Sequence, residues 1–294
     1  MKVYVEPHTD SRGILRVRDA LIKYAPQKVE FVSEQGQCDL AILHVFGRHT
    51  STGKTIQWLK EHGKQYAMIQ YCLRSTMRPS TTDWIDMWAG AKLVWSYYDL
   101  PAACSMDGML YGGKRKFSFY HAPLGVDAGI FYPRHSPFSK FIVATCSQHA
   151  LSEGVKECVV AAKRLGKTVF HIGHELRRGP DIVCKSGISD EDLAWFYSQC
   201  RYVSGLRRVE GFELPAAEGL LCGARPILYD QPHYRTWYDG LATFIPEESR
   251  EKVTDHLEAL FSSAYTPVTR DEIEEGKRRF NWQTIITGFW EALL

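Results

Sequence analysis

Two glutamates, Glu210 and Glu218, bracket a loop that leads into a helix near the start of the last third of the chain. Between them, Gly211 permits close approach of the backbone, and Pro215 suits the first helical residue because its missing N–H would have no partner there anyway. The N–H groups of residues 212–214 would point out of the helix N-terminus, which favours an anion. Although such a stretch also occurs as an ordinary helix cap, its spacing predicts backbone donors directed at a phosphate and carboxylates directed at hydroxyl groups.

Charge is distributed unevenly along the chain. Residues 1–140 carry 18 Lys and Arg against 12 Asp and Glu, a formal charge of +6, and residues 141–294 carry 18 against 22, a charge of −4. A basic front half suits an anionic partner such as nucleic acid, a phospholipid surface or a phosphorylated glycan, and a chance imbalance on solvated faces is the alternative. Because no stretch of 18 apolar residues and no signal-peptide core is present, we expect a cytoplasmic protein, associated at most with a membrane surface.

The eight cysteines are scattered singly, without a C-x-x-C pair or a Cys/His cluster at the spacing of metal ligands. This pattern predicts free thiols and argues against a disulfide framework or a structural zinc site. The acidic run at residues 190–192 fits the first turn of a helix, where negative charge is favourable. We therefore expect no metal site.

The segments before the acidic loop alternate between strands and helices, as in a doubly wound α/β protein. An apolar strand at residues 2–6 is followed by a turn with Gly13 and by an amphipathic helix that begins at Ile14. The continuously apolar run at residues 39–45 predicts a central parallel strand, and His44 ends it in a place that suits either a structural or a catalytic histidine. Further strands are predicted at residues 28–33, 65–71 and 92–97, with a helix at residues 55–62.

A second α/β run begins after a connection near residues 124–140. Its predicted strands lie at residues 141–146, 168–173, 202–204, 225–230 and 242–246. Its predicted helices lie at residues 155–165, 190–200, 215–222, 247–263 and 270–292, the second opened by a capping box of Ser189 and Asp192. This alternation predicts two Rossmann-like α/β domains facing across a cleft. Residues 1–123 with a C-terminal helix at about 280–294 would form the first, and residues 124–279 the second.

Five segments of the second half resemble, in sequence order, motifs of retaining glycosyltransferases with the two-domain GT-B fold. These family-four-like enzymes include sucrose synthase-like enzymes and mannosyltransferases. The segments are G-V-D-A-G-I-F-Y-P at 125–133, V-C-K-S-G-I-S-D-E-D-L at 183–193, E-G-F-E-L-P at 210–215, E-G-L-L-C-G-A-R-P at 218–226 and R-F-N-W at 279–282. Glu210 and Glu218 have the E-x7-E spacing of the family, and the resemblance covers residues 121–290.

The resemblance implies a nucleotide-diphosphate sugar as the donor substrate, metal-independent transfer without a cofactor, and a role for each matched residue. Glu218 would bind the ribose, and Glu210 would be the catalytic-site residue beside the hydroxyls of the donor sugar. Lys185 and Ile188 would flank the nucleobase. The diphosphate and the sugar would contact the loop residues Gly211, Phe212, Glu213 and Leu214.

The start of the donor domain's first helix departs from the family pattern. The family commonly places an Arg and a Lys-Gly pair there to hold the diphosphate, whereas residues 147–154 read S-Q-H-A-L-S-E-G. Lys156, Arg207 and Arg208 are the candidate replacements. We count Arg208, together with Gly13, among the expected donor-binding residues.

Three functions fit these residues. The first is a retaining glycosyltransferase that acts on an acceptor hydroxyl, with hydroxymethylated DNA, a lipid phosphate or a glycan as the acceptor. The second is a GT-B-fold protein that binds a nucleotide sugar or a glycan without transferring it, which the missing cations and Glu213, in place of the second Gly of the family's E-G-F-G, would explain. The third is an epimerase or a phosphorylase on the same fold.

Overall fold

The computed structural model describes residues 1–7, 12–45, 50–71, 87–99, 118–134, 140–147, 154–173, 181–208 and 211–294 of the 294-residue chain. The chain divides into two compact units. Unit 1 comprises Met1–Leu124, Val209–Phe212 and Trp282–Leu294, and unit 2 comprises Gly125–Arg208 and Glu213–Asn281. The polypeptide therefore leaves unit 1 after Leu124 and returns to it for its last segment.

Within the described residues, unit 1 is built on a sheet of six parallel strands in the order β2-β1-β3-β4-β5-β6. The strands are β1 (Lys2–Val5), β2 (Glu30–Phe31), β3 (Leu40–Val45), β4 (Gln65–Gln70), β5 (Val94–Ser96) and β6 (Phe119–His121). β3 is buried at every position, as its uninterrupted apolar sequence predicts for a strand covered on both faces. β2 is shorter than the predicted strand 28–33, because it is an edge strand that pairs with β1 at two positions.

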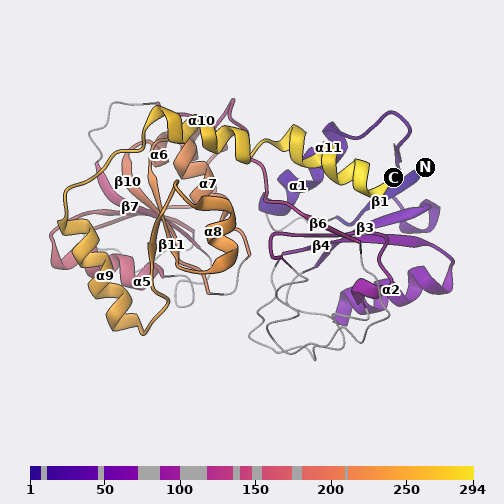
Figure 1. The fold of residues 1–294 in the computed structure, drawn as a ribbon, viewed down its shortest axis with the longest axis horizontal. Helices are drawn as coiled ribbons and strands as arrows, with labels where there is room; N and C mark the ends of the chain where they lie inside the picture. The colour runs from indigo at the N-terminus through magenta and orange to yellow at the C-terminus, as the bar shows by residue number, and fades with distance from the viewer. Residues whose placement is uncertain are drawn as a thin grey trace. The chain divides into compact units, whose positions relative to one another are not determined.

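The helices of unit 1 are α1 (Arg12–Lys23), α2 (Thr50–Glu61) and α11 (Trp282–Leu293), with a 3₁₀ turn, η1 (Gln35–Gln37). α2 packs on the face of Met68 and Val94, while α11 packs on the opposite face, where Phe289 lies 5.4 Å from Trp95 between ring centroids. Figure 1 shows α11, in yellow, beside α1. The hydroxyl of Tyr120 donates to the carbonyl of Ile285 at 2.6 Å, so α11 is bonded directly to the sheet.

Unit 2 is likewise built on a sheet of six parallel strands among the residues that the structure describes, in the order β12-β11-β10-β7-β8-β9. The strands are β7 (Phe141–Ser147), β8 (Val169–Gly173), β9 (Ile182–Lys185), β10 (Cys200–Gly205), β11 (Arg225–Tyr229) and β12 (Thr243–Ile245). Counted from its first strand, this is the Rossmann order, whereas unit 1 has the flavodoxin-like order. The prediction of two parallel-sheet α/β domains is confirmed.

The helices of unit 2 are α5 (Val155–Arg164), α6 (Asp190–Tyr197), α7 (Leu214–Leu221), α8 (Pro232–Tyr238), α9 (Arg250–Ser262) and α10 (Arg270–Arg279). α5 packs against α9, and α7 packs against β10, with Gly219 in close contact with Val203 (Figure 1). Among the described helices, none combines the length and the apolar character needed to cross a bilayer.

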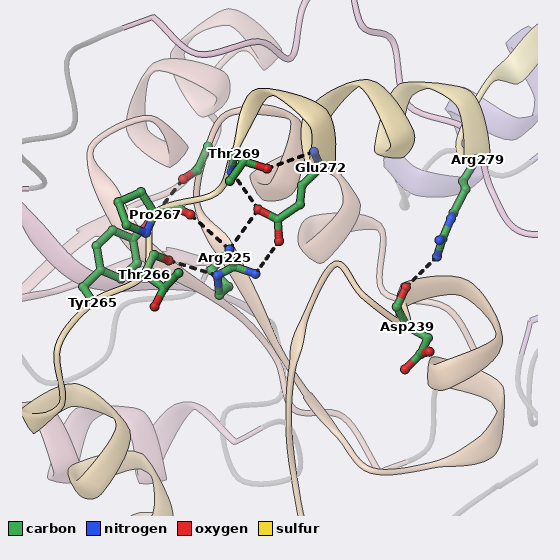
Figure 2. Close-up of polar contacts among 9 residues, drawn as sticks. Arg225, Asp239, Tyr265, Thr266, Pro267, Thr269, Glu272 and Arg279 are labelled. Atoms are coloured by element: carbon green, nitrogen blue, oxygen red, sulfur yellow. Dashed lines mark hydrogen bonds and ion pairs between the residues drawn. The ribbon is translucent and has the colours of Figure 1, made fainter.

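The predicted continuous helix at residues 270–292 is wrong, because the chain breaks between α10 and α11. At the break, Val126 N–H donates to the carbonyl of Phe280 at 2.8 Å, and Val126 forms a parallel bridge with Asn281. The side chain of Arg279 donates to the carbonyls of Trp237 and Asp239, at 3.1 and 2.9 Å, and so caps the end of α8. Figure 2 shows Arg279 reaching Asp239 in this way.

Candidate functional site

The strand orders mark one position in each unit where a ligand is expected. In open parallel sheets, ligands bind outside the carboxyl ends of the strands at the point where the strand order reverses. In unit 1 this switch point lies between β1 and β3, and in unit 2 it lies between β7 and β10. The predicted donor-site residues of the second half can be compared directly with the second position.

The N-termini of α5 and α7 both lie close to the carboxyl end of β10. Gly154, the N-cap of α5, has the left-handed φ of 68°, and a Cβ atom placed on it would lie 2.5 Å from the Cβ of Leu206. Glu213, the N-cap of α7, also lies close to this part of the chain, because a Cβ atom on Gly205 would lie 2.9 Å from its Cγ. Both helices thus direct the positive ends of their dipoles toward the switch point of unit 2.

The acidic loop itself is described only in part. Val209 and the predicted catalytic residue Glu210 lie outside the described residues. Gly211 and Phe212 belong to unit 1, where a Cβ atom on Gly211 would lie 2.4 Å from the Tyr98 ring. Phe212 packs against Tyr97 with 5.7 Å between ring centroids. The close approach that Gly211 was expected to permit is therefore made to tyrosine side chains of unit 1.

Glu213 and Leu214 lie at the start of α7. The helix begins at Leu214, so Pro215 is its second residue, one position later than predicted. The Glu213 side chain is 1% exposed and forms no cap to its own helix. It lies 3.1 Å from Arg207, measured from Oε2 to Nε, so the residue that replaces the family's second glycine is a buried member of an ion pair.

Glu218 lies in the second turn of α7 and is 2% exposed. In addition to burial, its charge raises the pKa of two buried neighbours, Cys222 and Tyr238. Burial raises the pKa of Cys222, and the Glu218 carboxylate raises it further. Burial likewise raises the pKa of Tyr238 well above 10.0, with additional contributions from Glu213 and Glu218. A buried carboxylate that faces neutral hydroxyl and thiol groups can accept hydrogen bonds from a polyol such as ribose.

The remaining predicted residues lie elsewhere. Lys185 ends β9, two strands from β7 in the sheet, and Ile188 follows it shortly before α6. Gly13 lies inside the first turn of α1 in unit 1, so the expectation that it forms the turn before that helix is wrong. Arg208 is directed at the β12–α9 connection, with Nη1 3.3 Å from Glu247 Oε1 and its guanidinium carbon 4.9 Å from the centroid of the Tyr229 ring.

A polar pair occupies the carboxyl edge of the unit 1 sheet. His44 is 1% exposed, and its Nδ1 lies 2.8 Å from the hydroxyl of Tyr71, which follows β4. The backbone N–H of His44 donates to the carboxylate of Glu6 at 3.0 Å, directly across the switch point between β1 and β3. Burial raises the pKa of Tyr71 well above 10.0, a hydrogen bond with Tyr97 opposes this shift, and Glu6 adds to it. Tyr71 is therefore a neutral hydroxyl.

Metal-binding potential is low in the part of the chain that the structure describes. No group of three or more His, Cys, Asp or Glu side chains there is arranged to hold an ion. The six cysteines in the described ranges, among them Cys158 and Cys200, are free thiols. Burial raises the pKa of Cys158 to about 12, so this thiol is a packing group and not a nucleophile.

Comparison with known proteins gives matches at the level of structure. No protein-family model and no curated protein matches the sequence. Sucrose-phosphate synthase from Thermosynechococcus elongatus matches with a TM-score of 0.77 and 14% identity, over 99% of this chain and 97% of that one. HepE from Anabaena, in complex with UDP and glucose, matches with a TM-score of 0.75 and 11% identity, over 99% and 98% of the two chains. A glycosyltransferase from Rickettsia africae matches with a TM-score of 0.68 and 11% identity, over 99% and 97%.

The chain has the GT-B fold. The two six-stranded parallel sheets and the full-length matches establish the architecture that the resemblance implied. At 11–14% identity the matches establish the fold alone.

At the unit 2 switch point, Gly154 is not among the predicted site residues, and Arg207 is one of the three candidate replacements for the missing cations. Gly154 has a sequence signal, since a glycine directly before an amphipathic helix is a permitted N-cap. Arg207 has none that separates it from its neighbour Arg208. Its position depends on Cys146, whose carbonyl accepts a hydrogen bond from Arg207 Nη2 at 2.8 Å, and on Glu213.

Proposed function

We propose that this chain is a retaining glycosyltransferase that transfers a sugar from a nucleotide-diphosphate sugar to an acceptor hydroxyl. The observation that carries the proposal is the meeting of the α5 and α7 N-termini at Gly205 and Leu206, the switch point of unit 2. Two helix dipoles aimed at one place suit a diphosphate, which carries more negative charge than a single helix N-terminus neutralises. The structural neighbour HepE was solved with UDP and glucose, a nucleoside diphosphate and a sugar.

The parts of the donor would be divided among the predicted residues. The diphosphate would lie at the helix N-termini, near Gly211, Phe212, Glu213 and Leu214. The ribose hydroxyls would bond to the buried carboxylate of Glu218. The base would lie toward β9, between Lys185 and Ile188, two strand spacings or about 10 Å from β7. This order matches the order of groups in a nucleotide sugar.

The chemistry would need no metal and no protein nucleophile. Backbone N–H groups at the helix termini would stabilise the charge that develops on the leaving diphosphate. That phosphate could take the proton of the acceptor hydroxyl on the face from which it departs, which retains the anomeric configuration. Glu210 would hold the hydroxyls of the transferred sugar. Activity in the presence of a chelator and the anomeric configuration of the product, read by NMR, test these two features.

The acceptor would be anionic. The formal charge of +6 over residues 1–140 favours modified DNA or a lipid phosphate over a neutral sugar. These two acceptors differ in their requirements, since transfer to DNA would fall steeply with salt and transfer to a lipid phosphate would need an anionic membrane surface.

A nucleotide-sugar screen tests the proposal. The protein is incubated with UDP-, GDP-, ADP- and dTDP-sugars, and the melting temperature and the release of nucleoside diphosphate are followed. We expect one donor to stabilise the protein and to be hydrolysed slowly, and we expect Glu218→Gln to abolish both effects. Glu258→Gln, which removes an exposed charge on α9, is the matched control. The absence of any effect from all donors would overturn the proposal.

Glu213 favours a second candidate, a protein that binds the donor without transferring the sugar. It adds a buried negative charge beside the expected diphosphate, where the family pattern has glycine. In that case a donor would raise the melting temperature, but no diphosphate would be released even with DNA, lipid and glycan acceptors present.

A further inference from the structure

Arg207 lies across the switch point of unit 2. It follows β10, and its Nη2 donates to the carbonyl of Cys146, near the end of β7, at 2.8 Å. β7 and β10 are the two strands between which the order of the sheet reverses. The guanidinium therefore reaches from the residue after β10 to the carboxyl end of β7.

Glu213 holds the other side of the same guanidinium. Its Oε2 lies 3.1 Å from Arg207 Nε, and its side chain is 1% exposed against 18% for Arg207. A buried carboxylate is costly unless it is paired, so the pair fixes both side chains. Because the Glu213 carboxylate forms no cap to α7, its position serves the arginine and not the helix.

Two tyrosines of α8 contact both members of the Arg207–Glu213 pair. The hydroxyl of Tyr234 donates to the carbonyl of Arg207 at 3.1 Å and lies 3.4 Å from Glu213 Oε1. The hydroxyl of Tyr238 donates to the carbonyl of Glu213 at 2.7 Å. Both tyrosines are fully buried. Such a set of contacts holds a cation in one orientation before any ligand arrives, which lowers the entropic cost of binding.

The two other candidate cations are placed differently. Lys156 is exposed in the first turn of α5. Arg208 pairs with Glu247 and donates to the carbonyl of Glu248 at 2.9 Å, so it is directed at the β12–α9 connection. The guanidinium of Arg207, by contrast, donates to a carbonyl of β7, a switch-point strand.

We propose that Arg207, positioned by Glu213, binds the diphosphate of the donor. This inference rests on the proposed function, and it identifies the group that replaces the cations missing from residues 147–154. A guanidinium has five N–H donors in a rigid fork, so it can serve a carboxylate, a carbonyl and a phosphate together. A lysine has a single compact charge and would not reproduce this geometry. Glu213 is a positioning residue that acts through Arg207.

Binding of a series of ligands that differ only in phosphate number tests the inference. Affinities for UDP, UMP and uridine are measured by calorimetry for the wild-type protein and for Arg207→Ala, Arg207→Lys and Glu213→Gln. GDP or ADP with their monophosphates and nucleosides replace the uridine series if UDP gives no binding. We expect Arg207→Ala to weaken UDP binding about 10- to 100-fold and to leave uridine binding unchanged. Arg207→Lys would lose nearly as much, and Glu213→Gln would lose less, with the same dependence on phosphate.

Two further variants separate recognition from folding. Arg207→Ala leaves Glu213 buried beside an empty position, so the double variant Arg207→Gln/Glu213→Gln removes both charges, is isosteric at position 213 and keeps a longer side chain than alanine at position 207. Its circular dichroism and melting curve report whether unit 2 is folded. Arg164→Ala, which removes an exposed arginine that pairs with Asp255 on α9, is the matched control and should bind UDP as the wild type does.

The outcomes distinguish this inference from the proposed function. If the wild type binds a nucleoside diphosphate and the folded double variant binds it equally well, the assignment of Arg207 is wrong and the proposed function stands. If the affinities for the diphosphate and the nucleoside fall together in Arg207→Ala, Arg207 has only a structural role. If the wild type binds no nucleoside diphosphate, both proposals fail.

Discussion

The guanidinium of Arg225 holds both carboxylate oxygens of Glu272, with Nη1 2.9 Å from Oε1 and Nη2 3.0 Å from Oε2. Arg225 begins β11 and Glu272 lies in the first turn of α10, so this pair fastens the helix to the sheet (Figure 2). The same guanidinium donates to the carbonyls of Thr266 and Pro267, both at 3.1 Å, and Glu272 completes a capping box with Thr269. The connection from α9 to α10 is therefore organised around a single arginine.

Substitutions of this pair should destabilise unit 2. The side chains of Arg225 and Glu272 are 13% and 20% exposed, so little solvent screens the pair. We expect Glu272→Gln to lower the free energy of unfolding by about 1.5–3 kcal/mol, the range for hydrogen bonds to charged groups. Glu274→Gln, which breaks an exposed pair with Lys277 on the same helix, should change it by less than about 0.5 kcal/mol. Denaturant unfolding measures the free energy of unfolding of each variant. Equal losses in Glu272→Gln and Glu274→Gln would show that the bidentate geometry adds no stability.

The contribution of Glu272 should depend on pH. Burial raises the pKa of Glu272, and the hydrogen bonds from Arg225 and Thr269 together outweigh burial, so the pKa lies below its ordinary value of 4.5. The stability that this carboxylate contributes is therefore fully present above 4.5 and is lost as the pH falls through the lower pKa of the folded state. We expect the stability difference between the wild type and Glu272→Gln to shrink on acidification. Unfolding curves from about pH 7 down to pH 3 measure this difference in stability. A difference that does not change with pH would contradict the lowered pKa of Glu272.

Gly154→Ala should damage both the fold and the binding site of unit 2. The substitution strains a backbone with a φ of 68° and brings a Cβ atom against Leu206. Gly166→Ala is a matched control, because Gly166 has a φ of 61° with nothing within 4 Å of its Cβ position. We expect about 1 kcal/mol of destabilisation from the backbone alone at Gly166 and about 1–3 kcal/mol more at Gly154. UDP affinity, measured by calorimetry, should fall only in Gly154→Ala. An unchanged affinity in Gly154→Ala, or an equal loss in Gly166→Ala, would contradict this prediction.

Tyr71→Phe should destabilise unit 1. The substitution removes the hydroxyl that lies 2.8 Å from Nδ1 of the buried His44 and leaves the ring in place. The expected loss is about 1–3 kcal/mol, since a buried ring nitrogen loses a hydrogen-bond partner. Tyr132→Phe removes a hydroxyl from a residue that is 42% exposed and should leave the melting temperature unchanged. A melting temperature that is insensitive to both substitutions would show that the His44–Tyr71 contact has no energetic role.

The central strands were predictable from sequence because they are largely apolar runs, whereas the short strands β6 and β9 at the sheet edges were not predicted. β3 and β7 have such sequences, and both lie inside parallel sheets. The break between α10 and α11 was not predictable from apolar periodicity, because it depends on Val126, which pairs with Phe280 and Asn281 from the opposite end of unit 2. Local periodicity continues through a break that is imposed by a partner so distant in sequence.

The helix that follows the acidic loop was predictable, but the placement of the charged residues beside it was not. Glycine, proline and glutamate at their spacing specify a helix N-terminus near carboxylates, which is local information. Arg207 and Arg208 are adjacent and chemically identical, yet one is directed at Cys146 and the other at Glu247. Both residues follow the end of β10, where the N–H of Arg207 donates to the carbonyl of Gly205 at 2.9 Å, so the chain turns there and each side chain is directed by its tertiary partners. Glu210 lies outside the described residues, so its role stays a prediction.

The return of the last segment to unit 1 has a consequence for the order in which the protein folds during synthesis. Unit 2 is complete once Asn281 has been made, whereas unit 1 lacks α11 until residues 282–293 have been added. Until then, the sheet surface around Trp95 and Tyr120 has no Phe289 to cover it. Although unit 1 begins before unit 2 in the sequence, it matures after unit 2, and its nascent form presents an aromatic surface of the kind that chaperones protect.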